Sequence, residues 1–364
     1  MKNSLTFPRF ALALIATFIL TSAGCDISFT MTDGYSFNWT GQTAEHSEEG
    51  TFDEGVTKIK IVNKFGNVNI SEADGEPGWS WNAKVWADSQ ELADQFMDDL
   101  FMDVQTDGNT QTWTISLPES SSDLNGVKSN LTMKLPADVS AKIENRHGNS
   151  IVKDLTSNVD LNNAHGDVDI NMVTGRIDVV NAHGDLLANQ IAAGNFKNSH
   201  GDTSIVDSTS DVEIRSSHGS VRVEKIQGSL TVDGSHGDLI AYDVQNIKAE
   251  NSHGKTRIRS AGERVEVDSA HGDIDVTMNS SSFKSIDLET SHATIEVMLP
   301  ASSDPAITMD TTHGKMVSEF ESQVGSGSQV DLKNRHGDIK VRKFTAEAES
   351  TAEVTAESPA EATQ

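Results

Sequence analysis

The sequence is poor in residues that form cross-links, rigid turns or positively charged surfaces. Its 364 residues include one cysteine, Cys25, and seven prolines, and 28 lysines and arginines stand against 55 acidic residues, for a net charge of −27. Such an acidic surface repels phosphate backbones and anionic lipids, so nucleic acid is not expected as a partner and membrane attachment should depend on acyl chains. The apolar run at residues 10–20 is too short to span a bilayer.

The amino end predicts a lipoprotein signal peptide over residues 1–24. Lys2 and Arg9 precede the apolar run, and small residues follow it directly before Cys25. This order resembles a bacterial lipobox, with Ser22 where that pattern prefers leucine, and it implies cleavage before Cys25 and lipidation of its thiol and new amino group. With Cys25 lipidated, no thiol remains for a disulfide, redox chemistry or a metal site. The alternative is an ordinary secretory signal with an incidental cysteine.

Most of the chain is an internal repeat centred on a histidine. Glycine follows the histidine in every unit except one, where Ala293 takes its place, and the spacing is 17 or 18 residues before it lengthens to 21 and 23. A repeat this regular predicts a solenoid. The eleven histidines are His147, His165, His183, His200, His218, His236, His253, His271, His292, His313 and His336.

Within one unit the apolar residues alternate with a period of two. We number positions from the histidine, so that Val159 and Leu161 stand at −6 and −4, and Val168 and Ile170 at +3 and +5. This alternation predicts two short strands with one buried face each, and an apolar residue at +8, such as Val173, suggests a third wall. The predicted fold is all-β: a single-chain β-solenoid, or β-helix, of coils of about 18 residues stacked about 4.8 Å apart.

Positions −4 and +3 are an odd number of residues apart, yet both carry inward apolar residues. The alternation of inward and outward side chains must therefore be interrupted once between them. The glycine at +1 is the natural place for the switch, because it accepts a positive φ. The histidines would then line the inner side of a corner, beside small polar residues at −2, and charging a buried column would be opposed, so stability would fall below about pH 6.5. If the switch precedes the histidine, the column faces solvent instead.

The other segments differ from the repeat in composition. We expect a signal peptide at 1–24, a tether with one strand pair at 25–54, a cap region at 55–140, the repeat array at 141–343 and a disordered acidic tail at 344–364. In the cap region, Phe65 stands in the histidine place of a degenerate repeat. An amphipathic helix is expected over about 89–102, with Asp88 as its N-cap, and it would pack on the open end of the solenoid.

The repeating unit, exemplified by His165-Gly166-Asp167, resembles a known family. Stacked strand–Gly-Asp–strand units behind a lipoprotein signal are similar to the bacterial putative-adhesin family of β-strand repeat proteins of unknown function, which in turn is similar to auto-transporter adhesin head domains. The resemblance covers about residues 56–343. It implies a single-chain β-solenoid without established catalytic residues. The histidine departs from the asparagine or serine that is commoner at that position.

The histidine column is the one feature that suggests chemistry. Its plain interpretation is a stacked polar corner kept uniform by duplication, and the alternative is divalent metal binding, with neighbouring imidazoles sharing a zinc, copper or nickel ion. Carboxylates at +2 would serve as ligands or as their supports. These are Asp167, Asp185, Asp202, Asp238, Asp273 and Asp338. The paired short spacings typical of zinc sites do not occur in the sequence.

An enzyme is the least favoured class, because the same residues recur in every unit and none stands out as a reaction centre. A solenoid that cleaves acidic polysaccharides would need a basic and calcium-binding cluster. The nearest basic group, Lys255, Arg257 and Arg259, fits a solvated strand face better. A polysaccharide-processing enzyme is therefore only the third interpretation.

The sequence thus predicts a non-catalytic, lipid-anchored binding, adhesin-like or scaffold protein of the bacterial cell envelope. It would be a monomer on the periplasmic or cell-surface side, attached to the membrane through acyl chains at Cys25. Its partner would be an envelope protein or a glycan, and it would need no cofactor. Divalent metal binding along the histidine column is the alternative.

Overall fold

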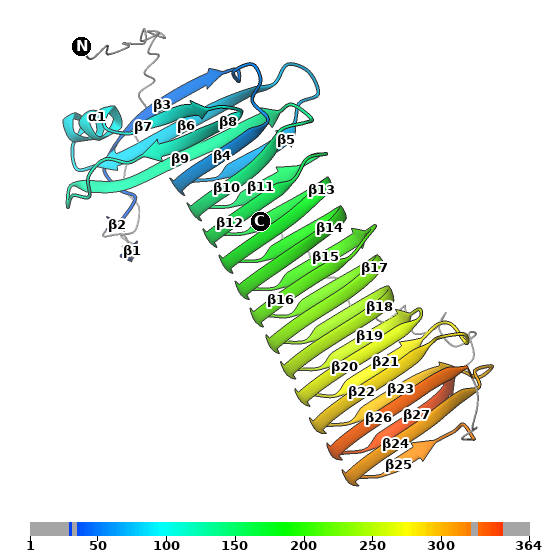
Figure 1. The fold of residues 1–364 in the computed structure, drawn as a ribbon. Coiled ribbons are helices and arrows are strands. Elements are labelled where there is room, and N and C mark those ends of the chain that lie inside the picture. The colour runs from blue at the N-terminus through cyan, green and yellow to red at the C-terminus, as the bar shows by residue number, and fades with distance from the viewer. Residues whose placement is uncertain (1–28, 31–34, 322–326, 345–364) are drawn as a thin grey trace, which may run out of the picture. The chain divides into compact units, whose positions relative to one another are not determined.

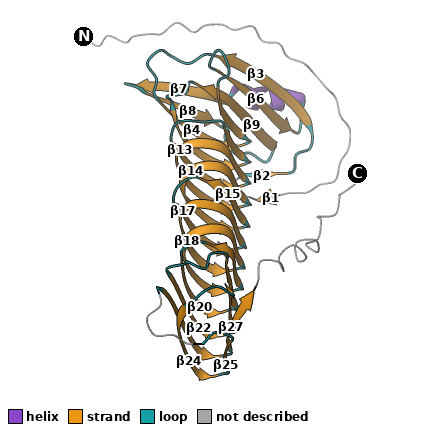
Figure 2. Ribbon diagram, turned by 90° about the vertical axis from the view of Figure 1, so that its right-hand side faces the viewer, coloured by secondary structure: helices purple, strands orange, loops and turns teal. Residues whose placement is uncertain are grey.

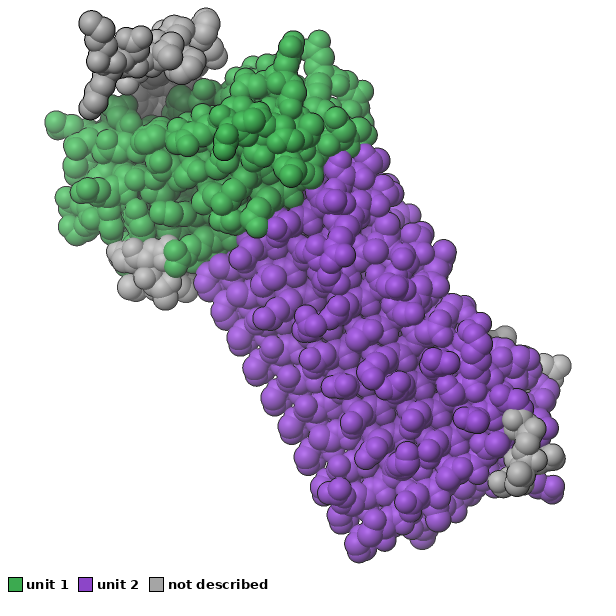
Figure 3. Space-filling view, in the orientation of Figure 1, with its two compact units in different colours: residues 1–148 green, residues 149–364 purple. Residues whose placement is uncertain are grey.

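The computed structural model describes residues 29–30, 35–321 and 327–344. The signal peptide, Cys25 and nearly all of the acidic tail, predicted from the sequence, lie outside these residues. The chain divides into two compact units, residues 1–148 and 149–364 (Figure 3). Strands dominate both units (Figure 1), which confirms the all-β class. In the part of the chain that is described, no helix has the length and apolar character needed to cross a bilayer.

In its described residues, unit 1 has ten strands and one helix. Its elements are β1 (Phe29–Thr30), β2 (Ser36–Phe37), β3 (Gln42–Gly50), β4 (Lys58–Phe65), β5 (Val68–Glu72), β6 (Gly78–Ala87), α1 (Gln90–Asp98), β7 (Phe101–Asp107), β8 (Thr110–Ser116), β9 (Leu124–Leu135) and β10 (Ser140–His147). The strand pair β1–β2 lies in the predicted tether. Residues 42–50 of that tether form β3 instead, which pairs antiparallel with β6, so the segment that could act as a tether ends earlier than expected.

The degenerate repeat of unit 1 folds as expected. β10 pairs in parallel with β4, and this register sets His147 opposite Phe65. The two rings stack with their centroids 5.0 Å apart. Phe65 is buried, and Asn63, two residues before it, donates a hydrogen bond from Nδ2 to the Gly66 carbonyl at 3.0 Å. The phenylalanine therefore takes the histidine place of a coil.

The helix differs from its prediction at both ends. Ser89, not Asp88, is the N-cap, and its Oγ accepts a hydrogen bond from the Leu92 N–H at 3.3 Å. Asp88 instead accepts a hydrogen bond from Asn125 Nδ2 at 2.8 Å. The helix ends at Asp98 because the chain from Phe101 pairs with β8 as β7, and this pairing overrides the apolar helical pattern. α1 packs on β3 and β6, and its role as a cap on the solenoid stays a prediction.

Unit 2 is a parallel β-solenoid, and Figure 2 shows its coils stacked one on another. Its strands are β11 (Ser150–Lys153), β12 (Val159–His165), β13 (Val168–His183), β14 (Leu186–His200), β15 (Thr203–Ser208), β16 (Val212–His218), β17 (Val221–His236), β18 (Leu239–His253), β19 (Thr256–Ala261), β20 (Arg264–His271), β21 (Ile274–Met278), β22 (Ser285–His292), β23 (Ile295–Pro300), β24 (Pro305–His313), β25 (Met316–Ser318), β26 (Ser328–His336) and β27 (Ile339–Phe344).

The predicted inward positions of the coils form the core. Leu161 at −4, Val168 at +3 and Val173 at +8 are all buried, and equivalent residues of other coils are buried with them. Each strand pairs in parallel with its equivalent in the next coil, so that like positions face like positions, as His165 faces His183. The two strands and the third wall expected from the sequence are confirmed.

The coils do not follow chain order at the carboxyl end. The sequence suggests that the coil of His313 follows that of His292 and that the coil of His336 comes last. Instead β26 pairs with both β22 and β24, so the coil of His336 lies between the other two (Figure 1). After β23 the chain leaves room for one coil and forms the terminal coil with β24 and β25. It then returns, and β26 and β27 form the coil in between.

Core composition explains this order. The coil of β26 and β27 carries Ile339 and Val341 at its inward positions, and both are fully buried between two neighbours. The coil of β24 and β25 has Ser318 opposite Val341, and its Met316 remains 50% exposed. The coil with the more apolar inward residues therefore lies between two other coils, and the coil with the less apolar inward residues lies at the end of the stack.

Candidate functional site

The corner that carries the histidines is held from inside by the residue at −2. Asn163 is fully buried, and its Nδ2 donates hydrogen bonds to the Gly166 carbonyl at 2.7 Å and to Asn181 Oδ1 at 3.1 Å. Asn181 repeats the bond to Gly184 at 2.9 Å. The asparagines thus satisfy the bent backbone and one another, as expected for small polar residues stacked at a corner.

Glycine at +1 is required by two independent constraints. Gly184 has φ +122°, a conformation that side chains disfavour. A Cβ on Gly184 would also lie 2.3 Å from the Gly166 carbonyl oxygen of the preceding coil. Only hydrogen fits between successive coils at this point.

The histidines of unit 2 face solvent, so the expectation of an inward column is wrong. The parallel ladder pairs Asn163 with Asn181 and His165 with His183, but it does not include Ala164 between them. The chain therefore bends before the histidine as well as at the glycine. The asparagine keeps the inner place, and the imidazole is turned outward and exposed.

The exposed imidazoles form one continuous stack. Neighbouring ring centroids are 4.6–5.2 Å apart, and the planes are within 18° of parallel. The spatial order is His165, His183, His200, His218, His236, His253, His271, His292, His336 and His313. His147 belongs to unit 1 and stacks on Phe65.

Crowding in the stack affects the basicity of His292. Partial loss of water around its ring lowers the pKa of His292 below the ordinary 6.5, and the positive charges of His336, His271 and Arg335 lower it further. Protonation of His292 is therefore opposed by its neighbours in the stack.

The six aspartates at +2 have a structural role. The Asp185 backbone N–H donates to Asp167 Oδ1 at 3.0 Å, and the Asp202 N–H donates in the same way to Asp185 Oδ1 at 2.9 Å. The other four repeat this bond to the next coil at 2.8–3.0 Å: Asp202, Asp238, Asp273 and Asp338. One oxygen of each carboxylate thus binds the backbone instead of reaching toward an imidazole.

The stack fits a multidentate metal site poorly. Ring nitrogens bind a metal along the ring plane, and parallel planes direct these lone pairs side by side instead of toward one point. Among the described residues, no cluster of three or more histidine, cysteine or acidic side chains is placed to hold a metal ion. A shared ion would need two neighbouring rings to rotate toward it.

Two of the three basic residues considered for an acidic substrate, Lys255 and Arg259, are paired with carboxylates. Arg259 donates to both carboxylate oxygens of Asp275, at 2.9 and 2.7 Å, and Lys255 lies 3.7 Å from Asp273. These ion pairs lie on an outer strand face. They do not form the free basic cluster that an acidic polysaccharide would need.

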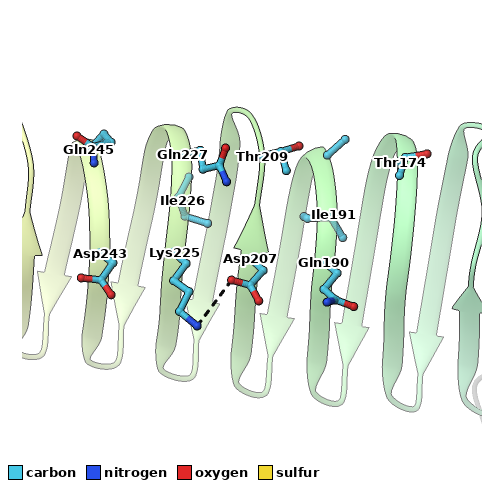
Figure 4. Close-up of a pocket in the computed structure, with 11 residues that line it drawn as sticks. Thr174, Gln190, Ile191, Asp207, Thr209, Lys225, Ile226, Gln227, Asp243 and Gln245 are labelled. Atoms are coloured by element: carbon cyan, nitrogen blue, oxygen red, sulfur yellow. Dashed lines mark ion pairs between the residues drawn. The ribbon is translucent and has the colours of Figure 1, made fainter.

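A groove runs along a second corner, which sequence reasoning missed. It has a volume of about 670 Å³ and crosses five coils, between the side chains at +7 and those at +9 (Figure 4). Gln190, Asp207, Lys225 and Asp243 stand on the +7 side. Their backbone is left-handed, with φ of 53–57°. The signal available in the sequence was a polar residue directly before most of the buried +8 positions, with Met172 as an exception.

The sequence model of the Toastrack DUF4097 family matches residues 56–342. The chain belongs to this family. The match spans both units of this Toastrack protein and confirms the family resemblance drawn from its repeats. No curated protein matches the chain.

Several solved structures are similar to this Toastrack chain at low sequence identity. Three of them are a putative lipid binding protein from Parabacteroides distasonis (17% identity, 82% of this chain and 97% of that chain, TM-score 0.35), a putative adhesin from Bacteroides fragilis (14%, 82%, 97% and 0.24) and a putative cell adhesion protein from Clostridium sporogenes (10%, 82%, 100% and 0.20). At these TM-scores they carry no argument about ligand or activity.

The lowered pKa of His292 predicts how the stack responds to acid. Unfolded His292 titrates near 6.5, so below that pH the unfolded chain binds more protons than the folded chain. The contribution of His292 to stability is then complete above about pH 6.5 and falls as the pH drops through the folded pKa. His336→Asn should raise the pKa of His292 toward its ordinary value, because a positive neighbour is removed, as measured by NMR titration.

His165→Asn, at the opposite end of the stack, is the matched control and should leave the titration of His292 unchanged. A wild-type pKa at or above 6.5, or one that does not respond to His336→Asn, would contradict the proposed coupling.

Proposed function

We propose that this Toastrack protein is a non-catalytic binding protein of the bacterial cell envelope, anchored by acyl chains at Cys25, that holds an extended partner along its solenoid walls. The partner would be an envelope polymer or an envelope protein. Contacts would be repeated from coil to coil, so that many weak and equivalent interactions add up to useful affinity.

One observation carries this proposal: the main surface groups of unit 2 occur as columns of equivalent residues. The ten imidazoles stack on one another in the same way. Each of the six +2 aspartates accepts a hydrogen bond from a backbone N–H of the next coil. Acid–base or nucleophilic catalysis needs unlike groups that converge in unlike environments. Columns of like groups instead suit a partner that is itself repetitive.

The charge of the chain supports acyl anchoring over electrostatic attachment. At −27 the protein is repelled by anionic lipid. The signal pattern before Cys25 supplies the alternative means of attachment, since two or more acyl chains hold a protein stably at a membrane.

Cell fractionation with the whole chain tests the anchor and the binding role together. The wild-type chain should stay with membranes in high salt, whereas Cys25→Ser should be released, because acyl chains and not charge hold it. After return to low salt, the released Cys25→Ser chain should co-sediment with purified cell envelopes and should leave their polymers uncleaved.

Release of the wild-type chain by salt would contradict the anchor. A Cys25→Ser chain that sediments with no envelope fraction, or that frees soluble fragments from an envelope polymer, would contradict a non-catalytic binding role.

The outward position of the imidazoles favours a second candidate function, divalent metal binding by pairs of rings on adjacent coils. Exposed rings have room to rotate, and neighbouring centroids are only 4.6–5.2 Å apart. Such two-ligand sites suit copper, nickel or zinc ions that complete their coordination with water.

Isothermal titration of the untagged whole chain with copper, nickel and zinc tests this candidate. Replacing every second histidine of the stack by asparagine leaves no adjacent pair, and it should abolish the heat of binding. That variant replaces His165, His200, His236, His271 and His336.

The matched control also replaces five histidines but takes consecutive members of the stack: His165, His183, His200, His218 and His236. Adjacent pairs remain in the other half of the stack, so roughly half of the metal should still bind. Absence of heat above buffer with the wild-type chain, or equal binding by the two variants, would contradict the candidate.

A further inference from the structure

The groove at the second corner has the form of a linear binding site. Its walls are the side chains at +7 and +9, which project from five successive coils, and its floor contains Ile191 and Ile226 (Figure 4). Both isoleucines are almost fully buried. The groove is thus a narrow channel between two mostly polar rims, running from coil to coil along the solenoid, with a small area of isoleucine surface at its floor.

The backbone at the +7 rim fixes the direction of the side chains there. Gln190, Asp207, Lys225 and Asp243 all have a positive φ of 53–57°. Glycine adopts this conformation without penalty, and aspartate tolerates it, whereas glutamine and lysine are strained. The +7 residues Asp154 and Ser260, which do not line the groove, have the same backbone, so this turn belongs to the coil and points every +7 side chain in the same direction.

The chemistry of the rims selects a neutral polar ligand. The +9 rim offers the hydroxyl of Thr209 and the amides of Gln227 and Gln245, and the +7 rim adds amide and carboxylate groups. Lys225 lies 3.9 Å from Asp207, so the ammonium is partly neutralised. Amides, hydroxyls and carboxylates hydrogen-bond sugar hydroxyls, while the chain's net charge of −27 repels anionic polymers.

The spacing of the coils agrees with this ligand class. Parallel strands lie about 4.8 Å apart, so each rim presents a side chain at that interval. An extended, β-linked pyranose chain advances by a similar distance for each sugar. A sugar ring has an apolar C–H face for the floor and equatorial hydroxyls for the two rims.

We propose that this groove binds a linear, uncharged, β-linked polysaccharide, with one sugar at each coil. The inference rests on the proposed function as an envelope-binding protein, and it names the ligand class and the wall that holds the ligand. The +7 side chains provide the outer hydrogen bonds, and the left-handed backbone directs them along one side of the groove.

Titration of the whole chain with cellohexaose and chitohexaose tests the proposal. Both β-linked oligosaccharides should bind, while α-linked maltohexaose, which curls, and the anionic hexagalacturonate should not. The rim variant combines Gln190→Gly, Asp207→Gly, Lys225→Gly and Asp243→Gly. It should weaken binding by about tenfold or more, because several hydrogen bonds are lost.

Glycine is used because it removes the rim without straining this backbone, so the melting temperature of the rim variant should not fall appreciably. The matched control combines Asp154→Gly and Ser260→Gly, which have the same left-handed backbone, with φ of 56° and 58°, but do not line the groove. The control should bind both oligosaccharides like the wild type.

Three results would overturn the proposal: no binding of either β-linked probe by the wild-type chain, equal binding of maltohexaose, or a rim variant that binds like the wild type. A wild-type chain that binds neither probe but still sediments with envelopes would end this inference and leave the proposed function standing. A chain that does neither would end both.

Discussion

The close approach of successive coils at the glycine corner constrains most of this structure. A Cβ on Gly184, Gly219 or Gly237 would lie 2.0–2.3 Å from the glycine carbonyl oxygen of the preceding coil. Most coils stack at β-ladder spacing by turning with the same left-handed glycine at the same place, and the coil with Ala293 is an exception. The recurrence of glycine and of the inward asparagine or serine follows from this requirement.

Because the coils are in register, equivalent side chains of successive coils form columns along unit 2. Since each residue pairs with its equivalent one coil away, an apolar residue lies on an apolar residue, and an imidazole lies on an imidazole. Each coil depends on its neighbours to bury its core, so stability is shared along unit 2. The exchanged order of the last two coils shows the same principle, because the coil that carries Val341 receives the covered place. The outer surface inherits the repetition, and this favours binding of an extended partner.

The sequence was sufficient for the features that follow directly from periodicity. The alternation around Leu161 and Val168 identified the core, and Phe65 was recognised as the substitute for a histidine. Periodicity did not reveal on which side of the histidine the chain bends, because a bend at Ala164 and a bend at Gly166 leave the same apolar pattern. The outward imidazoles were missed for that reason.

The remaining differences have equally local causes. Ser89 and Asp88 are both good capping residues, and only the turn geometry decides between them. The coil exchange follows from the inward residues of the last two coils, but the regular histidine spacing gives no sign that the chain skips one coil position and returns to it. The groove depends on a left-handed backbone at residues such as Gln190 and Lys225, where sequence patterns lead one to expect glycine or asparagine.

The central claim, that unit 2 is a stack of equivalent coils held in register, is tested most directly by deleting one coil. Removal of residues 254–271 joins His253 to Gly272 and keeps the repeat in phase, whereas removal of residues 254–262 puts it out of phase. The thermal unfolding of both variants is followed by circular dichroism. The account predicts that the full-coil deletion retains β structure and unfolds cooperatively at a modestly lower temperature, while the half-coil deletion loses cooperative unfolding. Loss of folding in the full-coil deletion, or equal behaviour of the two variants, would contradict it.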